Sequence, residues 1–267
     1  MTDRLRRDQA PISDRAWELI DEEATRSLRH WLAARALVDF SGPKGWEHSA
    51  ETSGRTDSAT SPVSGVDLHA RQVQPLVETR TPFTLSRSEL ESVDRGLSDP
   101  DLDPVTEAAR RAAEAEDRVV FAGGPGGLEG MAKASPHPAV SISNDYSRYP
   151  SHVASAVAAL RRAGIGGPYG IALGDRCYTG VIETTEHGGY PVLEHIRQIA
   201  GGPVVWAPAV DGALIVSMRG GDYELVSGAD FAVGYTGHSD SEISLYLEES
   251  FAFVVHDPKA ALPLLYQ

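Results

Sequence analysis

The residues best suited to chemistry in this sequence are the carboxylates and histidines between positions 183 and 195. They are Glu183, Glu186, His187, Glu194 and His195. A carboxylate-bridged metal site on helices is built from Glu-x-x-His pairs, in which a glutamate precedes the histidine by three residues. Neither histidine here has a glutamate at that distance. The spacing therefore predicts no metal site, because the ligand set that such a site needs is incomplete.

Other reactive side chains also lack the partners that catalysis needs. Cys177 is the single cysteine and has no activating motif beside it, so we expect a small buried side chain. Glu114, Glu116 and Asp117 form a cluster that is more typical of a solvated face or of salt bridges than of a general-acid pair. The sequence contains no Gly-x-Ser-x-Gly and no His-Glu-x-x-His motif. We therefore predict no catalytic residues and no enzyme.

The composition is that of an acidic globular chain. Its 267 residues include 24 Lys and Arg against 38 Asp and Glu, which gives a net charge of −14. This charge disfavours nucleic-acid binding, which needs clustered basic residues. No apolar run reaches the roughly 20 residues of a membrane span, and the N-terminus lacks the apolar segment of a secretory signal. A single cysteine permits no internal disulfide, so we expect a cytoplasmic protein. Because an apolar span is missing, we expect no membrane partner.

The N-terminal part of the chain predicts one long helix followed by a polar arm. Apolar residues at steps of three and four predict a helix over residues 13–38, which Gly42-Pro43 ends. Residues 51–65 contain seven Ser or Thr and only one large aliphatic side chain. A segment of this kind cannot form a core of its own. We interpret it as a projecting hairpin arm that needs a neighbouring chain, with a flexible linker as the alternative.

The middle of the chain predicts a second long helix and then a mixed α/β region. Pro104 favours a helix start, the small residues that follow favour close packing, and the expected helix spans 103–122. The glycines of 123–127 end this helix, since they lack the Gly-Lys-Ser/Thr of a phosphate loop. Further helices are predicted over 151–163, 176–183 and 191–200, and strands over 168–173, 204–206 and 213–217.

The C-terminal part is predicted to be rich in strands. The glycines in Arg219-Gly220-Gly221-Asp222 favour a tight turn whose charged ends could pair. Two short strands are expected at 223–226 and 231–235. Alternation of apolar and polar residues over 243–255 predicts a long half-buried strand. Glu249 interrupts the apolar side of this strand, and we expect it to mark a bend or an exposed stretch.

A series of short motifs carries a resemblance that no one of them carries alone. They are Ala10-Pro11-Ile12, Gly42-Pro43-x-Gly45-Trp46, Pro82-Phe83-Thr84-Leu85-Ser86-Arg87, Glu116-Asp117-x-Val119-x-Phe121-x-Gly123, Gly167-Pro168-Tyr169, Gly189-Tyr190-Pro191, Trp206-Ala207-Pro208, Arg219-Gly220-Gly221-Asp222-Tyr223-Glu224-Leu225 and Leu245-Tyr246-Leu247-x-Glu249-Ser250-x-x-Phe253. In this order they resemble an encapsulin, from about residue 4 to residue 262. Encapsulins are bacterial and archaeal shell proteins.

The resemblance implies an α+β fold of the tailed-phage major capsid type, Hong Kong 97 phage-like. Its parts would be a peripheral domain made of residues 1–45, 76–130 and 223–267, an extended loop at 46–75, and an axial domain at 131–222. The implied function is that of a self-assembling icosahedral shell of a nanocompartment. The smallest such shell holds about 60 copies, as icosahedral closure requires.

The resemblance also assigns functional residues. Cargo enzymes would dock through a C-terminal peptide on the surface made by Leu28, Trp31, Leu32, Arg35, Asp39, Phe231, Val233 and Tyr235. A five-fold pore loop would consist of Thr185, Glu186, His187, Gly188, Gly189 and Tyr190, and a charged ring there would favour small cations. The expected cargo is a dye-decolorising peroxidase or a ferritin-like protein. Ser88 stands where some members bind flavin through an aromatic ring, so no cofactor is expected.

Two other functions remain as alternatives. A phage or prophage major capsid protein would share the fold, but a scaffolding or protease segment would be expected, and the short stretch before Pro11 shows none. A protease or a secreted bacteriocin is less favoured, because the catalytic motifs and the secretion signal are missing. DNA inside purified particles would favour the first alternative, and activity of cargo-free subunits would favour the second.

Overall fold

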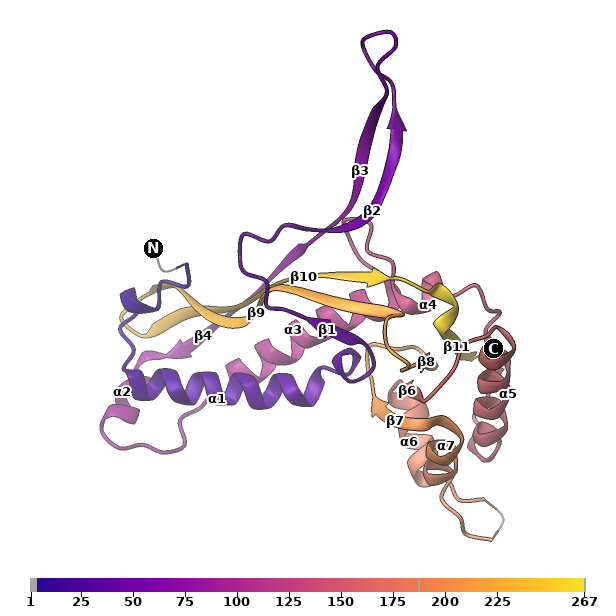
Figure 1. Cartoon of the computed structure of the whole chain (residues 1–267). Coiled ribbons are helices and arrows are strands. Elements are labelled where there is room, and N and C mark those ends of the chain that lie inside the picture. The colour runs from indigo at the N-terminus through magenta and orange to yellow at the C-terminus, as the bar shows by residue number, and fades with distance from the viewer. Residues whose placement is uncertain (1–3, 187, 267) are drawn as a thin grey trace.

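The computed structural model describes residues 4–186 and 188–266, and it has the predicted α+β architecture. A four-stranded sheet, a five-stranded sheet and a two-stranded hairpin organise it. Two long helices, α1 (Asp14–Trp31) and α3 (Asp103–Ala122), lie along the four-stranded sheet, and the hairpin stands out from the body (Figure 1). The five-stranded sheet and its helices form the other end of the molecule (Figure 1).

The sequence predicts that the first helix ends at residue 38, but in the structure it ends at Trp31. The backbone N–H groups of Ala33 and Ala34 each donate to a carboxylate oxygen of Asp117 at 3.0 Å, so they do not continue the helical ladder. The carboxylate of Asp117, on α3, thus takes the place of the backbone carbonyl groups that would accept these hydrogen bonds if α1 continued. The chain then makes a short 3₁₀ helix, η2 (Ala34–Ala36), before it enters the sheet.

The four-stranded sheet carries the long C-terminal strands. Its strands in spatial order are β1 (Asp39–Ser41), β9 (Tyr223–His238), β10 (Glu242–Val255) and β4 (Val77–Ser86). A short helix, α2 (Arg87–Asp94), follows β4. β9 is one continuous strand where the sequence predicts two, and register shifts against β10 absorb its irregular middle. Apolar side chains of α1, α3 and these strands form one core cluster.

The five-stranded sheet has a buried centre, since β6 (Tyr169–Leu173) and β8 (Ala213–Ser217) are buried at every residue. Its strands in spatial order are β5 (Val140–Ile142), β11 (Ala261–Tyr266), β8 (Ala213–Ser217), β6 (Tyr169–Leu173) and β7 (Gly201–Trp206). The helices of this part are α4 (Met131–Ala134), α5 (Tyr149–Arg162), α6 (Asp175–Glu183) and α7 (Val192–Ala200). Short 3₁₀ turns, outside the sheets, are η1 (Arg7–Gln9), η3 (Tyr146–Arg148) and η4 (Pro258–Ala260). The last strand, β11, belongs to the C-terminal segment 223–267 in sequence. It nevertheless pairs with β5 and β8 in the sheet that residues 131–222 form.

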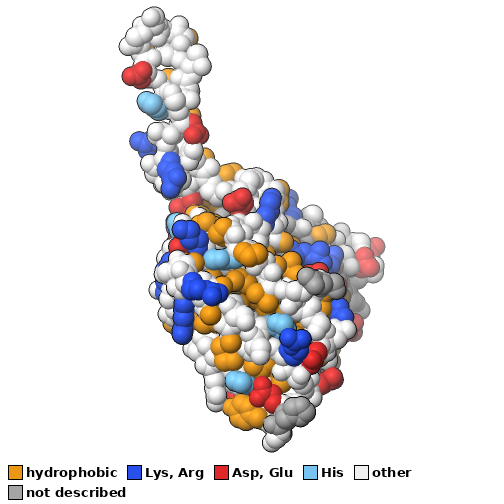
Figure 2. All heavy atoms as spheres, turned by 90° about the vertical axis from the view of Figure 1, so that its right-hand side faces the viewer, with side chains coloured by type: hydrophobic (Ala, Val, Ile, Leu, Met, Phe, Trp, Pro, Cys, Tyr) orange, Lys and Arg blue, Asp and Glu red, His pale blue; other side chains and the backbone are white. Residues whose placement is uncertain are grey.

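The polar arm is a hairpin, as the sequence predicts. It consists of β2 (Ala50–Ala59) and β3 (Leu68–Pro75), which pair only with each other. Most of its residues are exposed, and it extends well beyond the body (Figure 2). Figure 2 shows charged side chains along the arm below its tip, and no charged side chain at the very tip on this face. An isolated hairpin of this kind is marginally stable in water, so it is built to lie against something else.

Candidate functional site

The residues assigned to cargo docking fall into a buried and a partly exposed group. The buried group is part of the core between α1 and the four-stranded sheet and consists of Leu28, Val233 and Tyr235. The partly exposed group packs against the edge of that core and consists of Trp31, Leu32 and Phe231. A partner can touch only the second group directly, while the first group fixes the shape beneath it.

Arg35 lies at the centre of a buried cluster of carboxylates. Its Nη2 contacts Glu116 Oε2 at 2.5 Å and Glu249 Oε1 at 2.7 Å, and its Nη1 contacts Asp230 Oδ1 at 2.9 Å. One guanidinium therefore joins η2, α3, β9 and β10. The pKa of Arg35 is raised by Glu116 and Glu249 against the opposing effect of burial, so the group stays charged.

The outer edge of this cluster is aromatic. Phe40 and Phe231 lie on the Arg35 guanidinium, with ring centroids at 4.9 Å and 5.2 Å. Phe40 is 40% exposed, whereas the Arg35 side chain is 19% exposed. These three residues form what we call the aromatic edge. It offers apolar rings with a partly covered cation between them, which suits an apolar peptide side chain.

The burial of acidic residues corrects two expectations from the sequence. Glu249 is 1% exposed, so it does not mark an exposed stretch, although register shifts of β10 against β9 do occur beside it. Glu116 and Asp117 are not on a solvated face but buried, and Glu116 forms a salt bridge, the other expected role, with Arg35. Burial raises the pKa of Asp117 to about 7. Glu114 does lie on the surface. The position of Glu249 on the apolar side of its strand was the signal in the sequence that could have indicated a buried cationic partner, which is Arg35.

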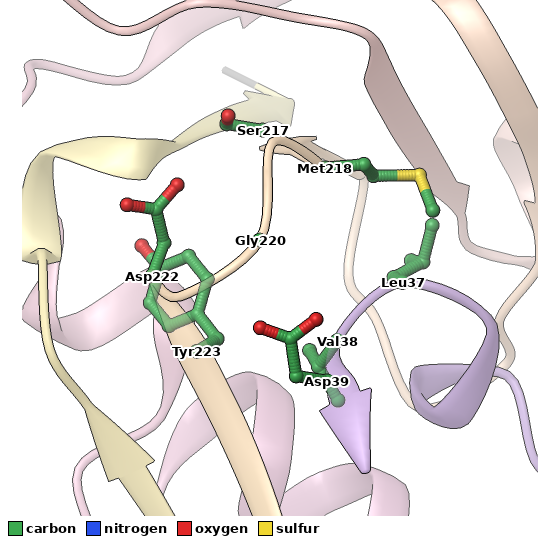
Figure 3. A pocket seen from close by; sticks show the side chains of 8 residues that line it. All are labelled: Leu37, Val38, Asp39, Ser217, Met218, Gly220, Asp222 and Tyr223. Carbon is green, nitrogen blue, oxygen red and sulfur yellow. The ribbon is translucent and has the colours of Figure 1, made fainter.

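Asp39, which was also assigned to docking, binds the backbone of the turn at residues 219–222. Its Oδ2 accepts a hydrogen bond from the N–H of Gly221 at 2.6 Å. Figure 3 shows the carboxylates of Asp39 and Asp222 beside a small cavity of about 60 Å³ that Tyr223 and Met218 also line. The main role that this geometry gives Asp39 is to hold the turn in place.

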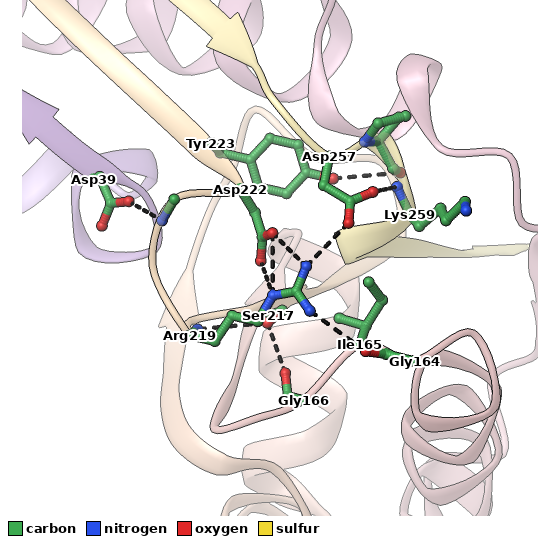
Figure 4. A network of polar contacts seen from close by, with 12 residues as sticks. Asp39, Gly164, Ile165, Gly166, Ser217, Arg219, Asp222, Tyr223, Asp257 and Lys259 are labelled. Carbon is green, nitrogen blue, oxygen red and sulfur yellow. Dashed lines mark hydrogen bonds and ion pairs between the residues drawn. The ribbon is translucent and has the colours of Figure 1, made fainter.

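That turn has the structure that the sequence predicts. Arg219 contacts Asp222 at 2.7 Å across the two glycines, and it also contacts Asp257 at 3.0 Å. Figure 4 shows how this network connects the end of β8, the start of β9 and the loop after β10. Asp222 is 5% exposed, so most of the pair is shielded from water. The network fixes the junction between the two sheets.

A second aromatic group lies where α1 meets the five-stranded part. The rings of Trp31 and Trp206 are 4.9 Å apart, and His30 is 5.5 Å from Trp206. Trp206 Nε1 donates to Asp175 Oδ1 at 2.6 Å. A cavity of about 350 Å³ opens here, with Arg110 of α3 on its wall. Trp31 therefore contacts this junction as well as the core of the four-stranded sheet.

The loop assigned to the pore is a closed turn between α6 and α7. The N–H of Glu186 donates to the carbonyl of Tyr190 at 2.8 Å, and Thr185 forms a bridge with Pro191. The Glu186 carboxylate contacts His195 Nδ1 at 2.9 Å, and the Tyr190 hydroxyl accepts from Gln198. Gly188 and Gly189 have φ of 107° and 81°, which side chains rarely adopt. His187 lies outside the described residues.

The cysteine, histidine and carboxylate side chains are the remaining candidates for reactive chemistry. Within residues 4–186 and 188–266, no group of three or more histidine, cysteine or carboxylate side chains could hold a metal ion. Cys177 is fully buried, as predicted, and its Sγ lies 3.0 Å from the Tyr149 hydroxyl and 3.2 Å from the Tyr266 hydroxyl. Burial raises the pKa of this thiol, which makes it unreactive. None of the described helices is long and apolar enough to cross a membrane.

The two sheets, the long helix α3 and the projecting hairpin form an arrangement that solved capsid structures share. The structure is similar to the virus-like particle from Pyrococcus furiosus, with a TM-score of 0.68 and 14% identity over 93% of this chain and 98% of that chain. It is also similar to the capsid of the empty GTA particle, with a TM-score of 0.55 and 17% identity over 88% and 89% of the two chains. The fold class is therefore the tailed-phage major capsid fold.

The sequence comparisons define the family within that class. Residues 1–252 match the family described as "Encapsulating protein for peroxidase". The chain is 48% identical to the type 1 encapsulin shell protein of Rhodospirillum rubrum, over 97% of this chain and 95% of that protein. It is 41% identical to that of Mycobacterium tuberculosis, over 97% and 98%. The chain thus belongs to the encapsulin family and is an icosahedral shell protein of that family.

Proposed function

We propose that this shell encloses cargo enzymes in a cytoplasmic nanocompartment, and that the subunit itself catalyses no reaction. The observation that carries the proposal is the hairpin of β2 and β3, which is exposed on both faces and needs another subunit to cover it. The family description names a peroxidase as what is encapsulated. A dye-decolorising peroxidase is therefore the first expected cargo and a ferritin-like protein the second. Mass spectrometry of proteins that copurify with shells from the native host tests this assignment.

We also propose how the subunit is divided. The four-stranded sheet with α1 and α3 would be the peripheral domain, built from residues 1–45, 76–130 and 223–267. The hairpin region 46–75 would be the extended loop, and residues 131–222 would be the axial domain. The position of β11 in the five-stranded sheet adds residues 261–266 to the axial side. Contacts between the sheets, such as Arg219 with Asp257, would then transmit forces between the domains.

The proposed docking surface for cargo is the aromatic edge together with Leu32. Its rings are accessible, and the buried residues Leu28, Val233 and Tyr235 support it from below. An extended peptide could place aliphatic side chains on Phe231 and Phe40. Burial of one such side chain contributes about 1.5–3 kcal/mol, which is enough for a specific but reversible contact when many sites line one wall.

We expect Phe231→Ala to abolish most cargo loading without loss of the shell. Truncation at this position removes the apolar contact without adding charge beside Arg35, and a loss of about 1.4 kcal/mol or more lowers occupancy about tenfold. The measurement is the cargo-to-shell ratio in purified particles by quantitative mass spectrometry. Ile182→Ala is the matched control, since Ile182 is an exposed apolar residue on α6, in another part of the chain. Equal loading in both variants would contradict the proposed docking surface.

The proposed pore loop consists of residues 185–190. It lies at the far end of the body from the hairpin, as the chain passes from α6 to α7 (Figure 1). Five copies would place carboxylates near one axis, and the Glu186–His195 contact would hold them in position. A negative ring of this kind raises the local concentration of cations.

We expect Glu186→Lys to slow the entry of divalent cations into assembled shells. Charge reversal in each of the copies around an axis replaces attraction with repulsion. The measurement is the rate at which Co²⁺ quenches a fluorescent protein enclosed in the shell. Glu183→Lys makes the same charge change at an exposed position on α6 and should leave the rate near that of the wild type. If both variants slow entry equally, the loop is not the cation path.

A further inference from the structure

The cluster around Arg35 holds more negative charge than one guanidinium can balance. Glu116 and Glu249 are both buried, with side chains that are 0% exposed, and Asp230 is 41% exposed. Ionised carboxylates cost several kcal/mol each to bury unless they are paired. Arg35 supplies one positive charge to these three groups, so an ionised Glu116 and an ionised Glu249 would leave one buried negative charge in excess.

The hydrogen bonds of Glu249 also indicate an excess of buried negative charge. Its Oε1 accepts from Arg35, but its Oε2 is buried and has no donor among the described residues. Glu116 Oε2 and Glu249 Oε1 both lie within 3 Å of the same arginine nitrogen. Glu116 and Glu249 also interact with each other through their side chains. Two carboxylate oxygens repel one another unless a proton lies between them.

We propose that Glu249 and Glu116 share a bound proton, and that this proton makes the contact of α3 with β10 a pH-sensitive lock. With the proton present, the pair carries a single negative charge, which Arg35 neutralises. One carboxyl group then donates to the other, and the buried acceptor gains its missing partner. Without the proton, the same three side chains carry a net charge of −1 in the core of the four-stranded sheet.

The charged groups around Glu249 set the direction of the effect. α3 contributes Glu116 and, beside it, Asp117; η2 contributes Arg35; and β9 contributes Asp230. On β4, Thr79 lies opposite Glu249 in register, and the nearby Arg80 contacts Glu248 instead. Burial and the charges of Glu116 and Asp230 raise the pKa of Glu249 well above its usual range, while Arg35 opposes them.

A raised carboxyl pKa gives the stability of the protein a defined pH dependence. Below the usual glutamate pKa, the group is protonated in both the folded and unfolded states, and its full contribution is present. As pH rises through the raised folded pKa, the unfolded state is already ionised and the folded state must also lose its proton. The folded state therefore loses stability with rising pH. Asp117, with its pKa of about 7, contributes a slope of the same sign.

Glu249→Gln tests the proposal, because glutamine keeps the hydrogen bonds of a protonated glutamate but cannot ionise. Melting temperatures of the purified assembly are measured from pH 5.5 to 9.5. We expect the wild-type melting temperature to fall by several degrees more than that of the variant. Glu242→Gln is the matched control on the same strand, at an exposed position, and should retain the wild-type slope. Identical slopes for wild type and Glu249→Gln would overturn the proposal.

A second measurement keeps the test decisive if the variant assembles poorly. Infrared spectroscopy of the wild-type assembly at pH 7 detects the carbonyl stretch of a protonated carboxylic acid, which an ionised carboxylate lacks. Asp117, with its pKa of about 7, contributes about half a protonated carboxyl per subunit to this band at pH 7, so we expect an intensity clearly above that level, which disappears as pH rises. An intensity at pH 7 no larger than Asp117 alone supplies would overturn the proposal. This result is independent of cargo and pores, so it does not depend on the proposed function.

Discussion

Replacing Arg35 with methionine is expected to cost about 3–5 kcal/mol of folding free energy, because it leaves buried carboxylates without their cation. A typical domain has only about 5–15 kcal/mol in total. The variant should therefore give little soluble protein, and what is soluble should unfold at a much lower temperature. The measurements are soluble yield and thermal unfolding followed by circular dichroism. Arg35 contacts both Glu116 and Glu249, so its loss leaves two buried carboxylates without a cation at once.

Two further variants separate the charge from the side-chain volume. Arg35→Met combined with Glu116→Gln and Glu249→Gln removes the buried charges together, and it should recover much of the lost stability. Arg26→Met removes an arginine from a pair with Glu23 on the exposed face of α1, where the Arg26 side chain is 74% exposed. That change should have an effect of less than about 1 kcal/mol. Wild-type stability of Arg35→Met would show that the cluster does not stabilise the fold.

Shortening the hairpin is expected to abolish shell closure while the body stays folded. Residues 53–72 would be replaced by an Asn-Gly turn, which keeps the pairing of Thr52 with Val73 at the base. The removed segment includes Val63, Val66 and Leu68, which are 59%, 52% and 46% exposed and contribute little to the core. Circular dichroism and thermal unfolding should therefore change little. Light scattering coupled to size-exclusion chromatography should report monomers or small oligomers.

A hairpin variant of unchanged length serves as the control. Ser58→Ala alters an exposed residue of β2 without removing chain, and it should assemble normally. If the shortened variant still forms closed particles, subunit contacts must lie elsewhere on the molecule. If instead it fails to fold, the hairpin supports the body, which its exposed residues and its self-contained pairing argue against.

Local patterns in the sequence predicted the elements whose stability is mostly local. The helix over 103–122 has the predicted bounds, because Pro104 favours its start and Gly123, with φ of 97°, ends it. The polar arm was predicted because its composition excludes a core. The turn at Arg219–Asp222 was predicted from its glycines and its opposite charges.

Contacts between distant residues explain what local patterns could not predict. The first helix stops at Trp31 because Asp117, more than 80 residues away, accepts the N–H groups of Ala33 and Ala34. Glu249 is buried because Arg35, at a separation of 214 residues, reaches it. The pairing of β11 with β5 and β8 is likewise long-range. In each case the tertiary partner overrides the preference of the segment itself.

The accessibility of the docking residues also could not be predicted from local patterns in the sequence. The resemblance assigned eight residues to docking, and amphipathic spacing could not separate the core side chains from the accessible ones. Leu28 and Val233 face the core, whereas Phe231 lies at its edge. Two residues at alternate positions of β9 thus differ in accessibility, since Val233 is 2% exposed and Phe231 is only partly buried. The aromatic ring of Phe40, which the sequence did not single out, completes the accessible surface.

Electron microscopy of the purified chain alone, together with light scattering, tests the shell function most directly. We expect closed particles of uniform diameter, about 20–35 nm across, as symmetric shells of about 60 or more subunits of this size require. They should form without cargo, nucleic acid or any second protein. Monomers or small open oligomers at every pH and salt concentration would contradict the shell function, and the projecting hairpin would then lack the neighbouring subunit for which it is built.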